Sequence, residues 1–300
     1  MKQTQTKLFD FSDVGLDFCA GSKNLFPDRF KKMLALGYNE QTVSSVAVAG
    51  NQVTLSYGVS HGYVADRVLK VSAPELLSIN GGEFVIDSVT KNTVTMTIDG
   101  APTSIAGNFT SRVASLGWSL GYENANVQVY KFKCLDDSDV YARLIFQNNL
   151  DYRNDVSVCI GKSFNLATGV ITDTNSLEEN RSNTSPSVIA WQFSYNAQSS
   201  YNNNTYAQGF NNHGQAKVVG SLYHLIFLVN TGSQLSPRFN SILPTETLDY
   251  ESVKYPLLIC DRAASVTGMG QNTGMTGTGI GFLGKIPVKF HGVTSQTILI

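Results

Sequence analysis

The stretch that decides the fold runs from Val43 to Trp118. It begins with VSSVAVAGNQVTLSYGVSHGYVADRVLKV at residues 43–71, continues as NGGEFVIDSVTKNTVTMTID at residues 80–99, and ends in SLGW. Short runs of alternating apolar and polar residues are separated by glycine and asparagine, a pattern typical of small β-hairpins. Strands are expected near residues 43–49, 52–57, 62–71, 83–90 and 92–98. Several short strands with no helix between them predict a small β-barrel or sandwich.

The chain is poor in charge for its length of 300 residues. Charged residues make up 15% of it, against roughly 25% in an average globular domain. The net charge of −1 gives no long-range attraction to nucleic acid or to anionic lipid. Large permanent interfaces are depleted in charge because an unpaired buried charge is costly. The composition therefore favours a subunit that neighbours cover, although many β proteins are simply poor in lysine and glutamate.

The cysteines are scattered through the chain, at Cys19, Cys134, Cys159 and Cys260. Zinc and redox motifs need close spacing, so no metal or cofactor is predicted and the thiols are expected to be free. The N-terminal MKQTQTKLFDFSD lacks the apolar stretch of a secretory signal. No run reaches the about 18 apolar residues of a membrane span. We therefore expect a protein made in the cytoplasm, with no signal peptide and no membrane partner.

Residues 1–24 are polar, with the isolated aromatic residues Phe9, Phe11 and Phe18. They are expected to form an extended arm with no core of its own, whose phenylalanines insert into a neighbouring subunit. A disordered tail is the alternative. Deletion of residues 1–20 is accordingly predicted to leave the fold intact and to prevent assembly.

The segment from Phe26 to Leu36 has a helical pattern. Pro27 suits a first helical turn and Gly37 ends the pattern. The apolar residues form one stripe: Phe26, Phe30, Met33 and Leu34. The helix and the small β-barrel are predicted to form one unit over residues 25–113.

Residues 114–300 are predicted to form a larger β-sandwich domain with long loop insertions. Strands are expected at residues 127–134, 139–147, 155–162, 187–195, 222–229, 255–262 and 285–291. The connections over 172–186 and 196–215 are long and polar, and loops of this length are usually functional or disordered. The fold class is thus mainly β, with one short N-terminal helix.

Three further segments are candidates for contacts with other molecules. Aromatic residues stand among asparagines in the 196–215 loop, where they could stack on a sugar or form an interface: Tyr201, Tyr206 and Phe210. The uncharged, glycine-rich loop 266–284 cannot bury much apolar surface unless a neighbour orders it. Candidate interface residues in that loop and in the apolar C-terminus are Met269, Met275, Ile298, Leu299 and Ile300.

Catalytic and metal motifs are weak in this sequence. Residues 279–284 match G-x-G-x-x-G, but Pro287 follows at once and no acidic residue comes after it, so the match is accidental. Asp136, Asp137 and Asp139 lack the spacing, glycine and glutamate of a calcium loop and are expected to form a turn. His61 is expected to serve the turn before Gly62. Motifs of nucleophilic catalysis do not occur, so no catalytic residue is predicted.

A series of short motifs follows one order along the chain. They are L-x-x-G-Y (Leu34, Gly37, Tyr38), H-G-Y (residues 61–63) with D-R-V (66–68), N-G (80–81) with E-F (83–84), L-G-W (116–118) with N-V-Q-V-Y (126–130), and G-F-L-G-K-I-P (281–287). In this order the motifs resemble a family of tailed-bacteriophage virion proteins from tail or baseplate gene clusters. The resemblance covers the chain from Phe26 to its end.

The resemblance implies a non-enzymatic structural subunit in a ring or sleeve of the phage tail, baseplate or neck. Its implied partners are copies of itself and other virion proteins. A receptor-binding or carbohydrate-binding tail appendage, a capsid decoration protein and a hydrolase are the alternatives.

Overall fold

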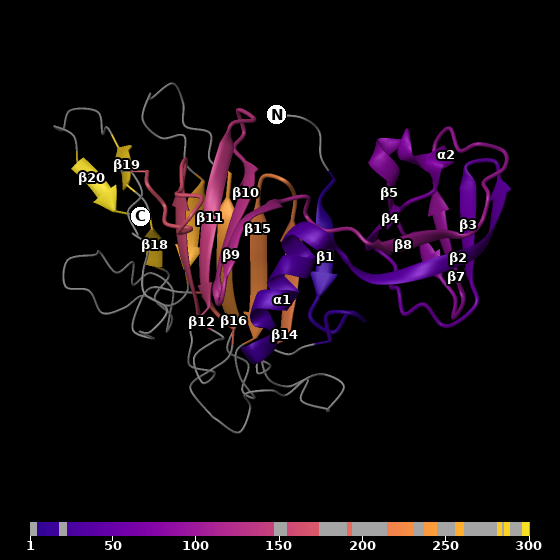
Figure 1. Ribbon diagram of the computed structural model, residues 1–300, viewed down its shortest axis with the longest axis horizontal. Helices are drawn as coiled ribbons and strands as arrows, with labels where there is room; N and C mark the ends of the chain where they lie inside the picture. Colours follow the sequence, from indigo (N-terminus) through magenta and orange to yellow (C-terminus); the bar gives the residue numbers. More distant parts are fainter. Residues whose placement is uncertain are drawn as a thin grey trace.

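The computed structural model describes residues 5–17, 23–146, 155–173, 191–193, 215–230, 237–244, 256–260, 281–283, 285–288 and 296–299. The fold is mainly β, with several antiparallel sheets, as the sequence predicts. Figure 1 shows a small β unit beside a larger unit of two sheets, with the N-terminal strand β1 (Lys7–Asp10) at their boundary.

The small unit is a seven-stranded sheet rolled into a barrel. Its order is β5-β4-β8-β2-β3-β7-β6. The strands are β2 (Tyr38–Ala49), β3 (Gln52–Tyr57), β4 (Val68–Val71), β5 (Glu83–Val85), β6 (Ser88–Val89), β7 (Thr93–Thr97) and β8 (Phe109–Val113). Two short helices, α2 (Pro74–Leu77) and η3 (Asn80–Gly82), connect β4 to β5.

The barrel closes because one short segment, residues 83–89, supplies both edges of the sheet. β5 pairs with β4, and β6 pairs with β7. Between them, Ile86 N–H donates to the Arg67 carbonyl at 2.9 Å, and Asp87 N–H donates to the Thr95 carbonyl at 3.0 Å. A closed barrel leaves no long unpaired edge to aggregate.

Two predicted strands of the barrel are shorter than expected. Residues 62–71 were expected to form one strand, but only β4 does so, and residues 58–67 form a loop. The loop is held by the Tyr63 hydroxyl, which lies 2.9 Å from the Asn39 carbonyl oxygen and 2.8 Å from that of Ser111 and shares its one hydrogen between them. The expected strand 83–90 is divided into β5 and β6 at the point where the barrel closes.

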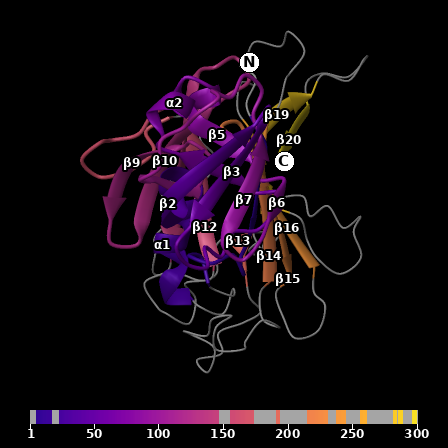
Figure 2. The same ribbon diagram turned by 90° about the vertical axis from the view of Figure 1, so that its right-hand side faces the viewer.

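The larger unit is a sandwich of two antiparallel sheets (Figures 1 and 2). The six-stranded sheet has the order β1, β14 (Gln215–Gly220), β15 (Leu225–Asn230), β16 (Pro237–Leu243), β17 (Leu257–Cys260) and β18 (Gly281–Leu283). The five-stranded sheet has the order β13 (Trp191–Gln192), β12 (Asp155–Gly161), β11 (Asp139–Phe146), β10 (Val127–Lys133) and β9 (Ser119–Asn124). β19 (Lys285–Val288) and β20 (Gln296–Leu299) pair separately.

The helical segment lies against the sandwich, and not against the barrel as the predicted 25–113 unit implies. It consists of η1 (Lys23–Leu25), α1 (Phe26–Lys31) and the π-helical turn η2 (Lys32–Leu36). The Gln128 amide on β10 donates to the Pro27 carbonyl at 3.0 Å, and Lys31 forms an ion pair with Glu123 on β9 at 2.7 Å. The barrel unit therefore begins at Tyr38, and the helix belongs with residues 114 onward.

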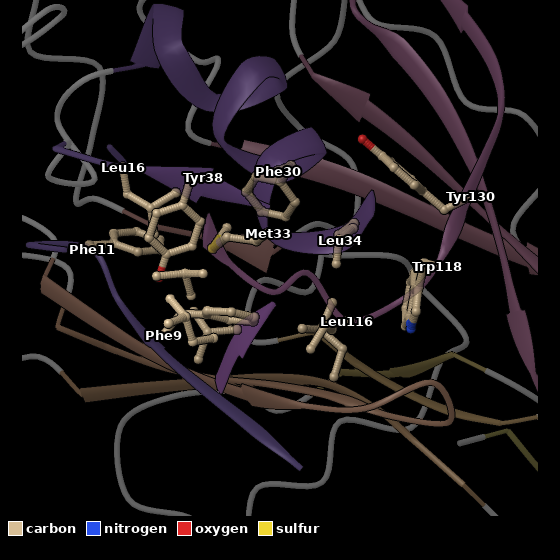
Figure 3. Close-up of a cluster of buried hydrophobic side chains, with 14 of the residues drawn as sticks. Phe9, Phe11, Leu16, Phe30, Met33, Leu34, Tyr38, Leu116, Trp118 and Tyr130 are labelled. Atoms are coloured by element: carbon tan, nitrogen blue, oxygen red, sulfur yellow. The ribbon is translucent and has the colours of Figure 1, made fainter. Parts of the chain in front are cut away.

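Aromatic side chains fill the space between the two sheets and the helix. Phe30, with no exposed surface, lies 5.3 Å from Phe146 of β11 and 5.4 Å from Phe227 of β15, measured between ring centroids. Phe193 contacts the same Phe30 and Phe227 rings. The predicted apolar stripe of the helix is thus confirmed as core, and Figure 3 shows this core continuing to Trp118 and Tyr130.

Gly37 joins the helix to the barrel in a backbone conformation that side chains rarely adopt. Its φ of 80° and ψ of 175° are accessible almost only to glycine, and a methyl group here would overlap the Val113 carbonyl oxygen. Gly50, in the β2–β3 turn, has a φ of 62° but open space around it. A side chain at Gly37 would meet both backbone strain and steric overlap, whereas one at Gly50 would meet backbone strain alone.

Gly37→Ala is expected to lower the free energy of unfolding by about 2–3 kcal/mol because strain and overlap add. Gly50→Ala, the matched control, is expected to cost only about 1 kcal/mol because the strain acts alone. Urea denaturation followed by tryptophan fluorescence measures both. Equal losses for the two variants would contradict the close approach of Gly37 to Val113.

Candidate functional site

A densely connected, largely buried polar site surrounds the N-terminal segment, defined here as residues 5–17. Its strand β1 pairs antiparallel with β14, in the register Lys7↔Gly220 to Asp10↔Lys217. The Phe11 N–H then donates to the Ala216 carbonyl at 3.0 Å. The segment is therefore part of the six-stranded sheet.

This position corrects the prediction of an extended arm without a core of its own. Phe9 and Phe11 have no exposed surface, so within a single copy both belong to the core. The Phe9 ring lies 6.0 Å from that of Tyr38, and the Phe11 ring lies 6.1 Å from that of Phe193. Both phenylalanines pack into the core of their own chain, because an apolar surface lies beside the edge of β14 with which β1 pairs.

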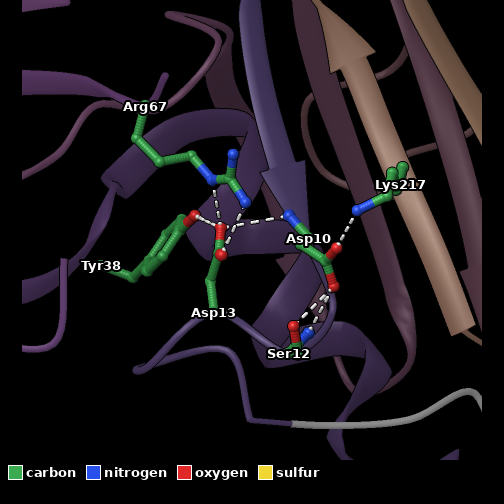
Figure 4. Close-up of polar contacts among 6 residues, drawn as sticks. All are labelled: Asp10, Ser12, Asp13, Tyr38, Arg67 and Lys217. Atoms are coloured by element: carbon green, nitrogen blue, oxygen red, sulfur yellow. Dashed lines mark hydrogen bonds and ion pairs between the residues drawn. The ribbon is translucent and has the colours of Figure 1, made fainter. Parts of the chain in front are cut away.

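Asp13 is the centre of the site and connects the N-terminal segment to the barrel (Figure 4). Its carboxylate accepts two hydrogen bonds from Arg67, at 2.8 Å from Nε and 2.9 Å from Nη2. It also accepts the Tyr38 hydroxyl at 2.7 Å and the Asp10 N–H at 3.1 Å. Asp13 is 5% exposed and Arg67 is 6% exposed, so this is a buried, bidentate ion pair.

The electrostatics of the site follow from burial and from the Asp13 charge. Burial raises the pKa of Tyr38 well above its ordinary value, and the neighbouring Asp13 carboxylate raises it further. Burial by itself would lower the pKa of Arg67, but the hydrogen bonds and charge of Asp13 outweigh it and raise that pKa. Tyr38 therefore stays neutral and Arg67 stays charged over the whole physiological pH range.

Two further ion pairs connect the N-terminal segment to both units. Asp10 pairs with Lys217 of β14 at 2.5 Å, and this lowers the Asp10 pKa although burial opposes the shift. Lys7 donates to the Ser115 carbonyl and pairs with Glu83 of the barrel at 2.7 Å. Burial lowers the pKa of Lys7, and the Glu83 charge opposes this shift. The segment thus contacts the sandwich through β14 and the barrel through Arg67 and Glu83.

These contacts fix the barrel against the sandwich. They leave neither Asp13 nor Tyr38 in a position to act on a substrate. Both Asp13 oxygens accept hydrogen bonds from groups of the chain itself. Tyr38 is nearly fully buried and its hydroxyl donates to Asp13, so it is a poor candidate for a catalytic acid. The arrangement is that of a positioning network.

The other candidates for chemistry in the described residues have structural partners. His61, 2% exposed, accepts the Tyr63 N–H at its Nδ1 atom at 2.9 Å, so it serves the turn as predicted. Its Nε2 atom lies 2.9 Å from the Thr90 carbonyl and therefore carries the hydrogen. The second contact joins the loop to the β6–β7 turn.

The acidic residues Asp136, Asp137 and Asp139 lie in and beside the turn between β10 and β11, as predicted. The Asp137 carboxylate accepts the Tyr223 hydroxyl, and Asp139 pairs with Lys133. No group of three or more histidine, cysteine or acidic residues is placed to hold a metal ion within the described ranges.

Most of the other predicted contact residues cannot be placed. Ile298 and Leu299 lie in β20, opposite Ile286 and Lys285 of β19. The rest lie outside the described residues: Phe18, Tyr201, Tyr206, Phe210, Met269, Met275 and Ile300.

The sequence motifs gave no indication of the Asp13 site. In the sequence, Arg67 belongs to the D-R-V motif and Tyr38 to L-x-x-G-Y, and neither motif predicts a contact with Asp13. Arg67 is a charged residue beside the apolar strand β4, and this is the one local signal that could have drawn attention to it.

No protein-family model and no curated protein matches the chain. In the part of the chain that the structure describes, no helix has the length and apolar character needed to cross a bilayer.

Proposed function

We propose that this protein is a non-enzymatic structural subunit of a tailed-phage virion, in the tail, baseplate or neck, and that it assembles as a homo-oligomeric ring or sleeve. The observation that carries the proposal is the buried N-terminal segment, which joins the barrel and the sandwich through one continuous core. A subunit that transmits force between neighbours needs its units fixed relative to each other. The low charge of the chain and the ordered phage motifs support the same function.

Exposed apolar side chains near the N-terminal segment offer a surface for assembly. The exposed fractions are 64% for Val59, 46% for Val64 and 53% for Val14. Val14 lies against Gly62, in the loop that carries the other two valines. Exposed apolar patches of this kind frequently mark protein interfaces.

The proposal is tested on purified protein and on intact particles. We expect light scattering after size-exclusion chromatography to give a discrete homo-oligomer. We also expect an antibody against the protein to label one position on phage particles, at the tail or its neck. Labelling over the whole capsid surface would instead favour a decoration protein.

The alternative functions make different predictions in the same material. A monomer that binds a glycan array would favour a receptor-binding appendage. Turnover of host envelope preparations would favour a hydrolase, and the saturated Asp13 network leads us to expect none.

A further inference from the structure

The N-terminal segment is bound by residues that lie far from it in the sequence. Asp13 and Arg67 are 54 residues apart, Lys7 and Ser115 are 108 apart, and Asp10 and Lys217 are 207 apart. The surface that receives the segment is therefore built by the rest of the chain, and the same surface exists on every copy of the protein.

The segment lies at an edge, where it can leave without dividing the sheet. Among the described strands, β1 pairs with β14 alone, and β14 pairs on its other side with β15. A vacated site would expose the β14 edge, the apolar surface around Phe26 and Phe193, and the unpaired Arg67 charge. Such a site selects for a ligand that combines a β-strand, two phenylalanines and a correctly placed carboxylate.

The order of synthesis favours late docking of this segment. β1 leaves the ribosome early, but its partner β14 follows about 200 residues later. Contacts between residues so far apart form slowly, because the long intervening chain must first be ordered. In the interval, the segment of one copy and the site of another can meet.

We propose that residues 5–17 exchange between neighbouring copies, so that the β1 strand of one subunit pairs with β14 of the next. The exchanged segment makes the same contacts as in the structure, including Phe9 and Phe11 in the core and Asp13 on Arg67. Each copy donates one segment and accepts one, a head-to-tail arrangement that closes into a ring. The inference rests on the homo-oligomer of the proposed function and names the segment that joins its subunits.

A disulfide between β1 and β14 tests the exchange. Leu8 and Val219 are direct partners in the register and are both partly exposed. Because Phe11 N–H donates to Ala216, the 8–219 pair is a non-hydrogen-bonded one, whose side chains are close enough for a disulfide. The double variant Leu8→Cys/Val219→Cys is refolded at high concentration, oxidised, and run on a denaturing gel without reductant.

We expect a ladder of covalent multimers that collapses to a single band on reduction. A stable oligomer whose chains all run as monomers with an internal disulfide would overturn the exchange and leave the homo-oligomer intact. A monomer in solution with an internal disulfide would overturn both. Mixing separate Leu8→Cys and Val219→Cys chains permits only intermolecular bonds, and these should link two chains if exchange occurs.

Two controls exclude trivial cross-links. The wild-type chain, oxidised and run on the same gel, shows any disulfide formed by the native cysteines. The variant Leu8→Cys/Leu228→Cys places the second thiol on β15, one strand beyond β14 and exposed, so it should give no ladder. Circular dichroism before oxidation shows whether each variant is folded.

Discussion

Replacement of Arg67 by methionine is expected to lower the free energy of unfolding by about 3–5 kcal/mol. The change leaves the Asp13 carboxylate buried without its cation, and the lost hydrogen bonds of the guanidinium have no replacement from water. Methionine retains most of the packing volume of arginine, so the loss in free energy of unfolding measures the removal of the guanidinium charge and its hydrogen bonds. Urea denaturation followed by the fluorescence of the buried Trp118 and Trp191 measures it.

Arg112→Met is the matched control for this prediction. Arg112 also pairs with a carboxylate, that of Glu40 at 3.3 Å, but both side chains are exposed. Exposed pairs contribute about 0–1 kcal/mol, so this variant should differ little from the wild type. A loss at Arg67 no greater than that at Arg112 would mean that the buried pair does not form in solution.

The double variant Asp13→Asn/Arg67→Met measures the interaction energy between Asp13 and Arg67, as distinct from what each side chain contributes by itself. Asparagine removes the buried charge but keeps an oxygen that can accept the Tyr38 hydroxyl. The double variant is therefore expected to lose less stability than the sum of the two single variants. If the double variant loses as much free energy of unfolding as the two single variants together, Asp13 and Arg67 do not interact directly.

The hairpins of the barrel could be predicted from the sequence because their contacts are local, whereas β8, which pairs with the distant strands β2 and β4, lies in no expected strand. The β2–β3 hairpin turns at Gly50 and Asn51, and the β6–β7 hairpin turns near Lys91 and Asn92. Both turns have residue types that favour tight connections, and the flanking strands alternate between apolar and polar residues. The helix was predictable for a similar reason, since its stripe and its terminal glycine are neighbours in the sequence.

Five strands of the sandwich lie outside the ranges expected from the sequence: β1, β9, β14, β16 and β18. Buried polar residues explain this for β16. In β16, Asn240 and Ser241 are both fully buried, so the strand lacks an apolar alternation. β14 does alternate, with Gln215 and Lys217 exposed and Ala216 and Val218 buried, but it begins at the last residue of the expected 196–215 loop and no strand is expected there. Burial of polar residues depends on the neighbouring strands, which a single sequence does not reveal.

The candidate site was the least predictable part of the molecule. Asp13, Tyr38 and Arg67 come from three separate segments, and only the fold brings them together. The isolated phenylalanines of the N-terminal segment predict burial against a partner surface, and the structure places that surface within the same chain. The sequence shows that an apolar side chain needs a partner, and it does not show which chain provides it.

Replacement of Phe11 by alanine distinguishes these two interpretations. Phe11 is fully buried against Phe26 and Phe193, so its truncation should lower the free energy of unfolding by about 3–5 kcal/mol. A segment that docks only on a neighbouring subunit would contribute nothing to the stability of a monomer. The structure therefore reverses the expectation that the fold is indifferent to loss of residues 1–20.

Val14→Ala, in the same segment, is the control, and the comparison is made at protein concentrations where the chain is monomeric. Val14 is 53% exposed, and surface changes of this kind usually alter stability by no more than about 0.5 kcal/mol. If Phe11→Ala unfolds at the same urea concentration as Val14→Ala, the N-terminal segment is undocked in the monomer. If Phe11→Ala alone is destabilised, a single copy carries its own segment, and exchange between copies replaces one set of contacts by an identical set.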